Sequence, residues 1–251
     1  MKFGIIAAGE GSRMVNEGMS IPKPLVRVDG VPMIERIIRI AKENEFESVS
    51  CIINEHSPKV KDFLTSKDFG IPLNLKILST PSSMHSLFEL SEYLNDDYFC
   101  LSASDSVFKS IEFSGFVNYA RKKVEIPSQK VDGVLAVTKY IDDEMPLYVN
   151  KNRENIIKEF SDSRSASEWV TGGIYFFSPR IFELVKTALD LNIKRLRNFL
   201  KLMLIEKYFL EGYIFSKIID VDHVNDIGKA EEFLKEKGIV WPVLPWQNKM
   251  L

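Results

Sequence analysis

The sequence has 251 residues and a mass of 28.8 kDa, which suits one large domain or two small ones. Hydrophobic residues make up 45% of the chain and charged residues 27%, which excludes a disordered chain, a collagen-like repeat and a disulfide scaffold. The 33 basic and 35 acidic residues leave a net charge of −2, with no long run of either sign. The chain therefore lacks the general basic footprint of a protein that binds nucleic acid or an anionic membrane, and any phosphate it binds is held locally.

Apolar runs in the sequence are short. The longest, such as Phe3–Ala8 and Phe199–Ile205, fall far below the ~18 residues that a membrane span needs. The N-terminal run ends at Gly9 without the apolar core or cleavage site of a signal peptide, so we expect no membrane partner and a cytoplasmic location. Cys51 and Cys100 lie within apolar runs, which predicts two buried, reduced thiols; a metal or redox pair is the alternative.

In the first half of the chain, apolar runs typical of strands alternate with stretches of amphipathic helical spacing. The predicted strands are Phe3–Ala8, Ser48–Ile53, Leu73–Leu78, Tyr98–Ser102 and Gly133–Val137. The predicted helices are Pro32–Asn44, Pro58–Lys67, Met84–Leu94 and Phe113–Lys123, with glycine, proline, asparagine and serine at the joins. Strands that alternate with helices predict parallel βαβ units in a doubly wound sheet.

After Thr138 the pattern changes, and short strands come before the helices. The predicted strands here are Leu147–Val149, Ile156–Phe160, Thr171–Phe177 and Tyr213–Val221, and the predicted helices are Pro179–Asp190, Lys194–Leu210 and Asp226–Lys237. Because no linker rich in proline, glycine or serine divides the halves, we predict one α/β domain over residues 1–237, a Rossmann-like α/β/α sandwich with a mixed, mainly parallel sheet. The apolar tail, residues 238–251, is expected to pack on this domain, with a homodimer contact as the alternative.

A glycine-rich turn follows the first predicted strand. It reads Ala7-Ala8-Gly9-Glu10-Gly11-Ser12-Arg13-Met14, and the segment Pro22-Lys23-Pro24-Leu25 comes shortly after it. Two glycines allow a tight turn whose N–H groups form a nest for a polyphosphate, although a plain strand-to-helix turn also uses glycine. Arg13 can bind two phosphate oxygens at once and Lys23 supplies a mobile charge, so together they suit a triphosphate. The Walker pattern is absent, and Met14 stands where the dinucleotide fingerprint needs a small residue.

These two motifs, followed by Val28-Asp29-Gly30-Val31-Pro32-Met33-Ile34, resemble the joint signature of the sugar nucleotidyltransferases, which are nucleoside-diphosphate-sugar pyrophosphorylases. The resemblance implies the nucleotide-diphospho-sugar transferase fold, with Arg13 and Lys23 as the catalytic residues. The segment Ser82–Leu87 is similar to the base-recognition segment of the family. By this resemblance, the nucleoside triphosphate is bound by Ala8, Gly9, Gly11, Ser12, Arg13, Ser82 and Ser83.

Weaker matches extend over nearly the whole chain. Asp105 stands where the family places its metal-binding aspartate, and Asp222 best fits the second ligand in the closing element Ile219–Ile227. The resemblance therefore implies Mg²⁺ as the cofactor, with Asp220 as the alternative second ligand and an ordinary turn as the alternative for Asp105. The strand Val170–Phe176 is similar to the sugar-site strand of the family.

The acceptor site is less well defined by the sequence. Thr171, Gly172 and Glu168 are expected to line it, although threonine and glycine in a strand also serve packing alone. Family members often carry Glu-Lys-Pro after the strand that precedes this region, but here the chain reads Ser161-Asp162-Ser163-Arg164. Arg164 or Lys158 would therefore have to hold the acceptor phosphate.

The predicted reaction is attack by an acceptor phosphomonoester, in the first instance a sugar-1-phosphate, on the α-phosphorus of a nucleoside triphosphate, with release of pyrophosphate and formation of an NDP-sugar. No general base is needed, because a phosphomonoester has a second pKa near ~6 and is already a dianion at neutral pH. The alternatives are a cytidylyltransferase acting on a non-sugar phosphate such as phosphocholine, a metal-dependent glycosyltransferase that would use Asp220 and Asp222, and a non-catalytic nucleotide-binding relative.

Overall fold

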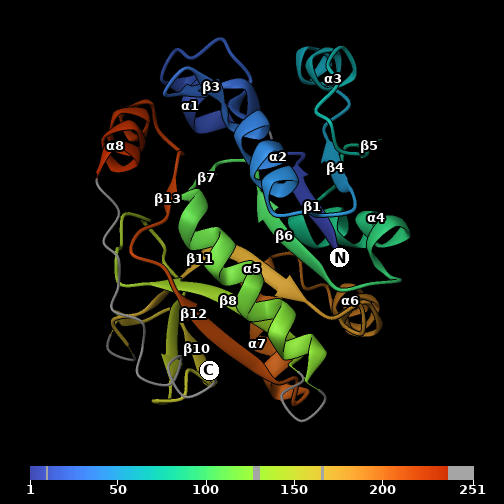
Figure 1. The fold of residues 1–251 in the computed structure, drawn as a ribbon, viewed down its shortest axis with the longest axis vertical. Coiled ribbons are helices and arrows are strands. Elements are labelled where there is room, and N and C mark those ends of the chain that lie inside the picture. Colours follow the sequence, from blue (N-terminus) through green and yellow to red (C-terminus); the bar gives the residue numbers. More distant parts are fainter. Residues whose placement is uncertain (10, 127–130, 165–166, 237–251) are drawn as a thin grey trace.

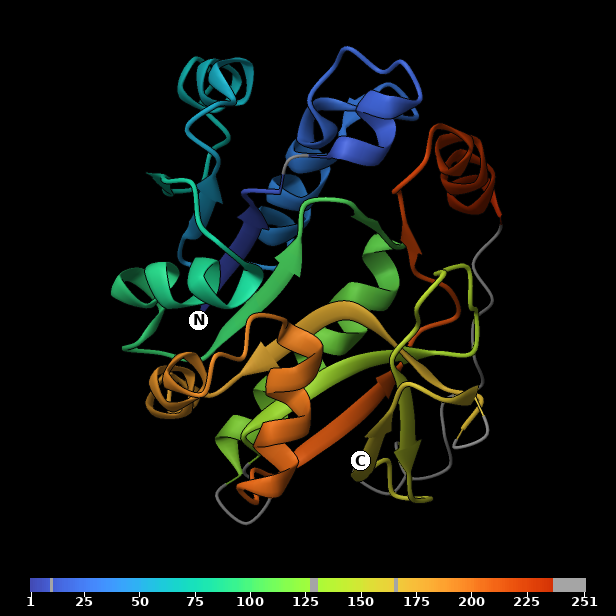
Figure 2. The ribbon, with the colours of Figure 1, turned by 180° about the vertical axis from the view of Figure 1, so that it is seen from behind.

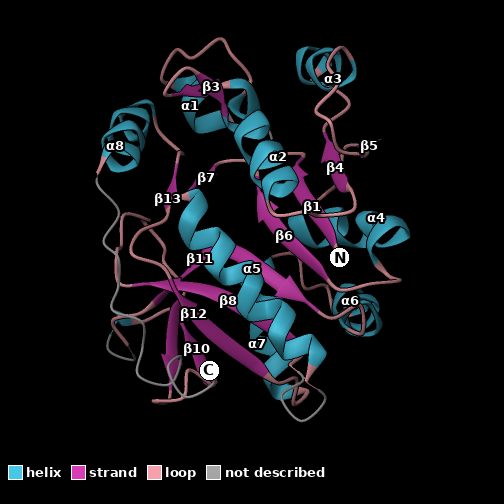
Figure 3. Cartoon of the chain, viewed as in Figure 1, coloured by secondary structure: helices cyan, strands magenta, loops and turns pink. Residues whose placement is uncertain are grey.

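The computed structural model describes residues 1–9, 11–126, 131–164 and 167–236. Its centre is a sheet of nine described strands in the order β10-β9-β11-β6-β1-β4-β5, with β8 paired to β11 and β12 paired to β8 (Figure 3). In chain order these strands are β1 (Lys2–Ala7), β4 (Val49–Ile53), β5 (Leu73–Ile77), β6 (Phe99–Ala103), β8 (Gly133–Thr138), β9 (Tyr148–Lys151), β10 (Ile157–Ser161), β11 (Val170–Phe177) and β12 (Leu210–Ile214).

The two halves of the sheet differ in strand direction. Strand β1 runs parallel to both of its neighbours, β4 and β6, and β5 extends this parallel half beyond β4. Strand β11 runs antiparallel to β6 and to β8, while β12 is again parallel to β8. Strands β9 and β10 form an antiparallel pair at the far edge. The predicted mixed, mainly parallel sheet is confirmed, because crossover helices build the first half and antiparallel connections build part of the second.

Helices cover both faces of the sheet, as Figures 1 and 2 show from opposite sides. One core cluster joins the sheet to α2 (Met33–Glu43), α3 (Pro58–Thr65) and α5 (Ser110–Glu125), and the other joins it to α4 (Ser83–Leu94), α6 (Ile181–Asp190) and α7 (Leu196–Ile205). Alternate residues of β8 serve the two clusters: Val134 and Ala136 belong to the first, Leu135 and Val137 to the second. The predicted α/β/α sandwich is confirmed.

A third, smaller apolar cluster lies beyond the carboxyl ends of β1 and β6. It joins elements from both ends of the chain: α1 (Ser12–Asn16), β2 (Arg27–Val28), β7 (Ser106–Val107), β13 (Ile219–Asp220) and α8 (Val224–Lys235). The 3₁₀ turn η1 (Lys23–Leu25) precedes β2 in the chain, and β3 (Val31–Pro32) pairs with it. Buried Met14, Val107 and Val221 belong to it, so the early loops, the segment after β6 and the segment before α8 share one core. Figure 1 shows α1, β3, β7, β13 and α8 together in one region of the molecule.

Two predicted elements in the second half are corrected. The helix predicted over Lys194–Leu210 ends at Ile205, because Lys207 takes a left-handed conformation with φ 60° and turns the chain into β12. The single strand predicted over Tyr213–Val221 is divided into β12 and β13, since β13 leaves the main sheet and pairs with β7. Neither break is marked by glycine or proline, so the sequence carries no local signal for it.

The remaining expectations concern the cysteines, the membrane and the tail. Cys51 and Cys100 are buried free thiols in β4 and β6, as predicted, and burial raises the pKa of Cys51 to about 12. Among the residues described here, no helix has the length and apolar character to cross a bilayer. The tail, residues 238–251, lies outside the described residues, so its packing and the homodimer contact stay predictions.

Candidate active site

The glycine-rich turn and the lysine segment lie against each other. The chain leaves β1 after Ala7 and turns at Gly11, whose φ of 62° lies in the left-handed region. A Cβ at Gly11 would stand 3.0 Å from the Cβ of Lys23. Glycine at this position therefore meets two needs: it adopts the turn without strain, and it leaves room for Lys23 to approach.

Lys23 lies at the start of η1 and bridges two carboxylates that are far from it in sequence. Its Nζ donates to Oδ2 of Asp105 at 2.5 Å and also to Oδ1 of Asp222. Only 13% of the Lys23 side chain is exposed. Burial lowers the pKa of Lys23, but the two carboxylates outweigh it and raise the pKa above its ordinary value. Lys23 therefore stays protonated at neutral pH and is not a candidate general base.

The two carboxylates are brought together by the small β7–β13 pair. Asp105 lies in the turn between β6 and β7, and Asp222 follows β13. Asp220 of β13 pairs with Ser106 of β7, and the N–H of Val221 donates to the carbonyl oxygen of Asp105 at 3.0 Å. Backbone hydrogen bonds thus fix the distance between the two aspartates, whichever groups their carboxylates contact.

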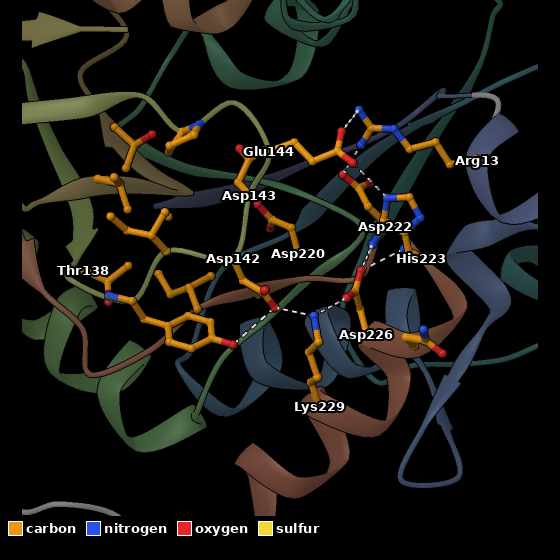
Figure 4. A pocket seen from close by; sticks show the side chains of 18 residues that line it. Arg13, Thr138, Asp142, Asp143, Glu144, Asp220, Asp222, His223, Asp226 and Lys229 are labelled. Atoms are coloured by element: carbon orange, nitrogen blue, oxygen red, sulfur yellow. Dashed lines mark hydrogen bonds and ion pairs between the residues drawn. The ribbon is translucent and has the colours of Figure 1, made fainter. Parts of the chain in front are cut away.

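Arg13 extends this charged cluster. Its Nη1 donates to Oδ2 of Asp222 at 2.6 Å, and its Nη2 lies 3.8 Å from Oε2 of Glu144 (Figure 4). Burial raises the pKa of Asp222, but bonds to Lys23 and the charge of Arg13 outweigh this and lower it below the ordinary value. Since 46% of the Arg13 side chain is exposed, its guanidinium can also meet an anion from solvent.

Asp220 lies next to these residues without a cationic partner of its own in the described structure. Its Oδ1 accepts a hydrogen bond of 2.7 Å from the hydroxyl of Ser106. Desolvation of the carboxyl group and the nearby carboxylates of Asp105 and Asp222 raise the pKa of Asp220 above its ordinary value. Asp220 therefore adds a third carboxyl group beside Asp105 and Asp222.

These carboxylates fit a small, hard divalent cation. Mg²⁺ prefers oxygen ligands and is usually held by one or two carboxylates together with substrate phosphates. Asp105 and Asp222 supply two converging carboxylates, and Asp220 stands beside them. Within the described part of the chain, no group of three or more acidic, histidine or cysteine side chains is arranged to hold a metal ion.

Two cavities meet at this cluster. The first, about 430 Å³, is named the phosphate hollow after the role predicted from the sequence; it is lined by Ile6, Ala7, Gly9, Gly11, Arg13, Lys23, Pro24, Ala103, Ser104, Asp105 and Asp222. The second, about 270 Å³, is named the acceptor pocket on the same basis and is formed by the segment after β8, the start of β11, and the region around β13 and α8 (Figure 4). Thr171 and Gly172 line the acceptor pocket together with Asp220. Arg13 and Asp222 line both cavities, so the two cavities adjoin at these side chains.

Comparison with known proteins agrees with this geometry. A sequence model of the family described as nucleotidyl transferase matches residues 4–239. The chain belongs to the nucleotidyl transferase family. It is 22% identical over 205 residues to "Probable glucose-1-phosphate cytidylyltransferase" of Bacillus subtilis, covering 73% of this chain and 77% of that protein. It spans about half the length of several other curated relatives.

Solved structures of nucleotidyl transferases share the fold. The inositol-1-phosphate CTP transferase from T. maritima superposes with a TM-score of 0.76 at 17% identity, covering 95% of this chain and 97% of that one. A UDP-glucose pyrophosphorylase complexed with UDP-glucose gives a TM-score of 0.75 at 15% identity, covering 92% and 97%. The predicted membership of the family and the predicted fold are both confirmed.

The remaining predicted acceptor residues of this nucleotidyl transferase lie outside the acceptor pocket. Arg164 lines a neighbouring cavity of about 760 Å³, the arginine hollow, which shares Glu144 and Pro146 with the acceptor pocket. The arginine hollow is lined by Glu144, Met145, Pro146, Tyr148, Asp162, Ser163, Arg164, Arg195, Arg197 and Asn198. Glu168 instead pairs with Lys139 at 2.9 Å and is not among the residues that line the described cavities.

The predicted base-recognition residues cap a helix. Ser82 is the N-cap of α4, and its hydroxyl hydrogen-bonds Nδ1 of His85 at 2.8 Å. The hydroxyl of Ser83 lies 3.4 Å from the carbonyl oxygen of Lys194. Ala8 is nearly buried, with its carbonyl oxygen 3.4 Å from Nδ2 of Asn54, and Ser12 begins α1. The predicted contact of these residues with a nucleotide stays a prediction.

Three groups of site residues were missed by sequence reasoning. Glu144, which approaches Arg13, lies in an acidic run that reads as a solvated loop. Lys229 of α8 bridges Asp142 and Asp226 on the wall of the acceptor pocket (Figure 4). Arg195 and Arg197 at the start of α7 line the arginine hollow. Their separation in sequence from the glycine-rich turn hid them, since only the folded chain brings them to the site.

Proposed function

We propose that this chain transfers a nucleoside monophosphate from a nucleoside triphosphate to a phosphomonoester acceptor, with a sugar-1-phosphate as the first acceptor to test, and releases pyrophosphate. One observation carries the proposal: Arg13 and Asp222 line both the phosphate hollow and the acceptor pocket, and Lys23 bonds to Asp222 between them. A binding protein for one ligand has no use for two cavities that share their charged residues. A group-transfer enzyme needs this arrangement, because both substrates must meet in line.

The charges of the site suit phosphoryl chemistry that uses no protein base. The acceptor phosphate is already a dianion at neutral pH, since its second pKa is about 6. Lys23, with its raised pKa, remains protonated and would face the α-phosphate, while the exposed guanidinium of Arg13 would hold the β- and γ-phosphates that leave as pyrophosphate. Asp105 and Asp222 would hold Mg²⁺, which when bound neutralises phosphate charge.

The acceptor is proposed to lie in the acceptor pocket, with its phosphate on the side lined by Arg13 and Asp222, so that the attacking oxygen faces the α-phosphate; the arginine hollow adjoins this pocket at Glu144 and Pro146. Thr171 and Gly172 would contact its neutral part. Arg164 and Arg195 line the arginine hollow, and a guanidinium group can bind two phosphate oxygens at once. Relatives whose names specify glucose-1-phosphate and inositol-1-phosphate support a phosphorylated ring as acceptor.

A thermal-shift series with ATP, GTP, CTP, UTP and dTTP, each with and without Mg²⁺, tests the donor site, with NAD as the contrasting ligand. At a hundred times Kd a ligand stabilises the fold by about 2.7 kcal/mol, which for a chain of this size raises Tm by roughly 5–10 °C. Pyrophosphate release is then measured with glucose-1-phosphate, inositol-1-phosphate and phosphocholine. A rise in Tm with NAD alone, or with none of the triphosphates, would refute the proposal.

A further inference from the structure

The ammonium group of Lys23 occupies the space between the two carboxylates expected to hold a divalent cation. Its Nζ lies 2.5 Å from Oδ2 of Asp105 and also contacts Oδ1 of Asp222. A magnesium ion bound by the same oxygens would stand about 2.0–2.1 Å from each. The Lys23 ammonium group and a metal ion bound by these two oxygens would therefore overlap, so they cannot bind at the same time.

We propose that Lys23 closes the divalent-cation site of the free protein, and that the site opens when a polyphosphate draws the Lys23 ammonium group away. The inference rests on the proposed function only for the identity of that polyphosphate, a nucleoside triphosphate. The ammonium group satisfies both carboxylates while the phosphate hollow is empty. When phosphates bind, the Lys23 ammonium group pairs with them. The carboxylates of Asp105 and Asp222 are then free to bind the cation.

The surroundings of Lys23 hold the start of its side chain and leave the rest of it beside the phosphate hollow. Pro22 and Pro24 flank the residue, and Gly11 lies against its Cβ, so the start of the side chain is held in place. Beyond Cβ the chain of methylene groups is flexible, and Lys23 lines the same hollow as Gly9 and Gly11, where a polyphosphate would lie. A swing of the ammonium group into that hollow would carry it from carboxylate to phosphate.

The charge balance gives the exchange a measurable consequence. With Lys23 in place, Asp222 is bonded to two cations, Lys23 and Arg13, and Asp105 to one. A divalent cation that approaches the free protein meets the positive charge of Lys23 at short range. If the metal site instead lay well away from the Asp105–Asp222 pair, removal of the lysine charge would change cation affinity only slightly, because distance and salt screening weaken the effect.

The test is a titration of the nucleotide-free protein with Mn²⁺, followed by the electron paramagnetic resonance signal of free manganese. Wild type is expected to bind Mn²⁺ weakly, and Lys23→Gln to bind it about tenfold more tightly or better. Lys23→Met, which keeps a long apolar side chain, is measured in parallel. Adding Asp222→Asn to Lys23→Gln should abolish the gain, because one of the two ligands is lost.

The matched control is Lys76→Gln. Lys76 bridges Glu89 and Glu92 at 2.8 and 2.7 Å on another part of the molecule, so its loss also frees two carboxylates. It should leave binding at the Asp222-dependent site as weak as in wild type. The inference is overturned if folded Lys23→Gln and Lys23→Met bind Mn²⁺ no more tightly than wild type. Because no nucleotide is present, this result is separate from failure of the proposed function, which the triphosphate series reports.

Discussion

Lys23 depends on neighbours from three distant parts of the sequence. Gly11 gives it room, Asp105 arrives from the end of β6, and Asp222 arrives from the segment before α8. Each contact is short in space and long in sequence, so the cluster forms only when the whole fold is present. Its single residues can nevertheless be tested one at a time, because most of them lie on turns and not within the sheet.

Asp222→Asn removes a charge and keeps the size of the side chain. The carboxylate bonds to both Arg13 and Lys23, and its loss would leave these cations misplaced for phosphate. We expect turnover, measured as pyrophosphate release, to fall by about a hundredfold or more with the circular dichroism spectrum unchanged. Full turnover that is still stimulated by metal would transfer the role of second ligand to Asp220. Asp96→Asn, which affects only an exposed pair with Lys2, is the control.

Gly11→Ala tests the contact between the glycine-rich turn and Lys23. An alanine at φ 62° is strained by about 1–2 kcal/mol, and its Cβ would press on Lys23. We expect Tm to fall by roughly 2–8 °C and turnover to fall with it. Gly9→Ala is the control for stability, because nothing lies within 4 Å of the added Cβ. Equal Tm values for the two variants would contradict this account of Gly11.

The end of α7 shows how a helix stops without glycine. The N–H of Tyr208 donates to the carbonyl oxygen of Met203 at 2.8 Å, and that of Lys207 to Leu204 at 3.1 Å, which is the hydrogen-bond pattern of a Schellman motif. Lys207 holds the left-handed position of this motif with φ 60°. The motif turns the chain toward β12, which pairs with β8 and completes the sheet.

Lys207→Gly should therefore stabilise the protein. Glycine takes the left-handed conformation without steric cost, and we expect the free energy of unfolding to rise by about 0.5–1 kcal/mol, or Tm by roughly 1–4 °C. Chemical denaturation measures the change. Lys207→Ala, which removes the same side chain and keeps the Cβ, should give no gain. An equal gain for Lys207→Ala would show that the gain comes from removing the lysine side chain. It would not then come from relief of backbone strain.

Apolar cores on both faces of the sheet and the buried carboxylate of Glu35 join distant parts of the molecule. Glu35 of α2 is 4% exposed and accepts hydrogen bonds from Arg39 of its own helix and from Lys67, which follows α3. The bond from Lys67 therefore joins α2 to the segment that follows α3. Burial raises the pKa of Glu35, but the bonds from Lys67 and Arg39 outweigh it and lower the pKa below 4.5.

A lowered carboxyl pKa makes stability depend on acidity in a defined direction. The folded state resists protonation of Glu35 more than the unfolded state, so its contribution is fully present above pH 4.5 and is lost as the pH falls through the folded value. Glu35→Gln should cost about 1–2 kcal/mol at pH 7, measured by urea denaturation, and the cost should shrink below pH 4.5. Glu232→Gln, at an exposed position on α8, should show no such trend. A cost that stays constant with pH would refute this role of Glu35.

Local patterns in the sequence determined the alternation of strands and helices, the two-sided burial of the sheet and the tight turn around Gly9 and Gly11. These features depend on neighbouring residues, so a linear reading finds them. Tertiary structure alone decided that Asp105 and Asp222 share Lys23, that Arg13 borders both cavities, and that Glu168 pairs with Lys139. It also decided the strand break before β13, because β13 exists only through its pairing with β7. Such contacts join segments far apart in the chain, and their geometry is set when the sheet assembles.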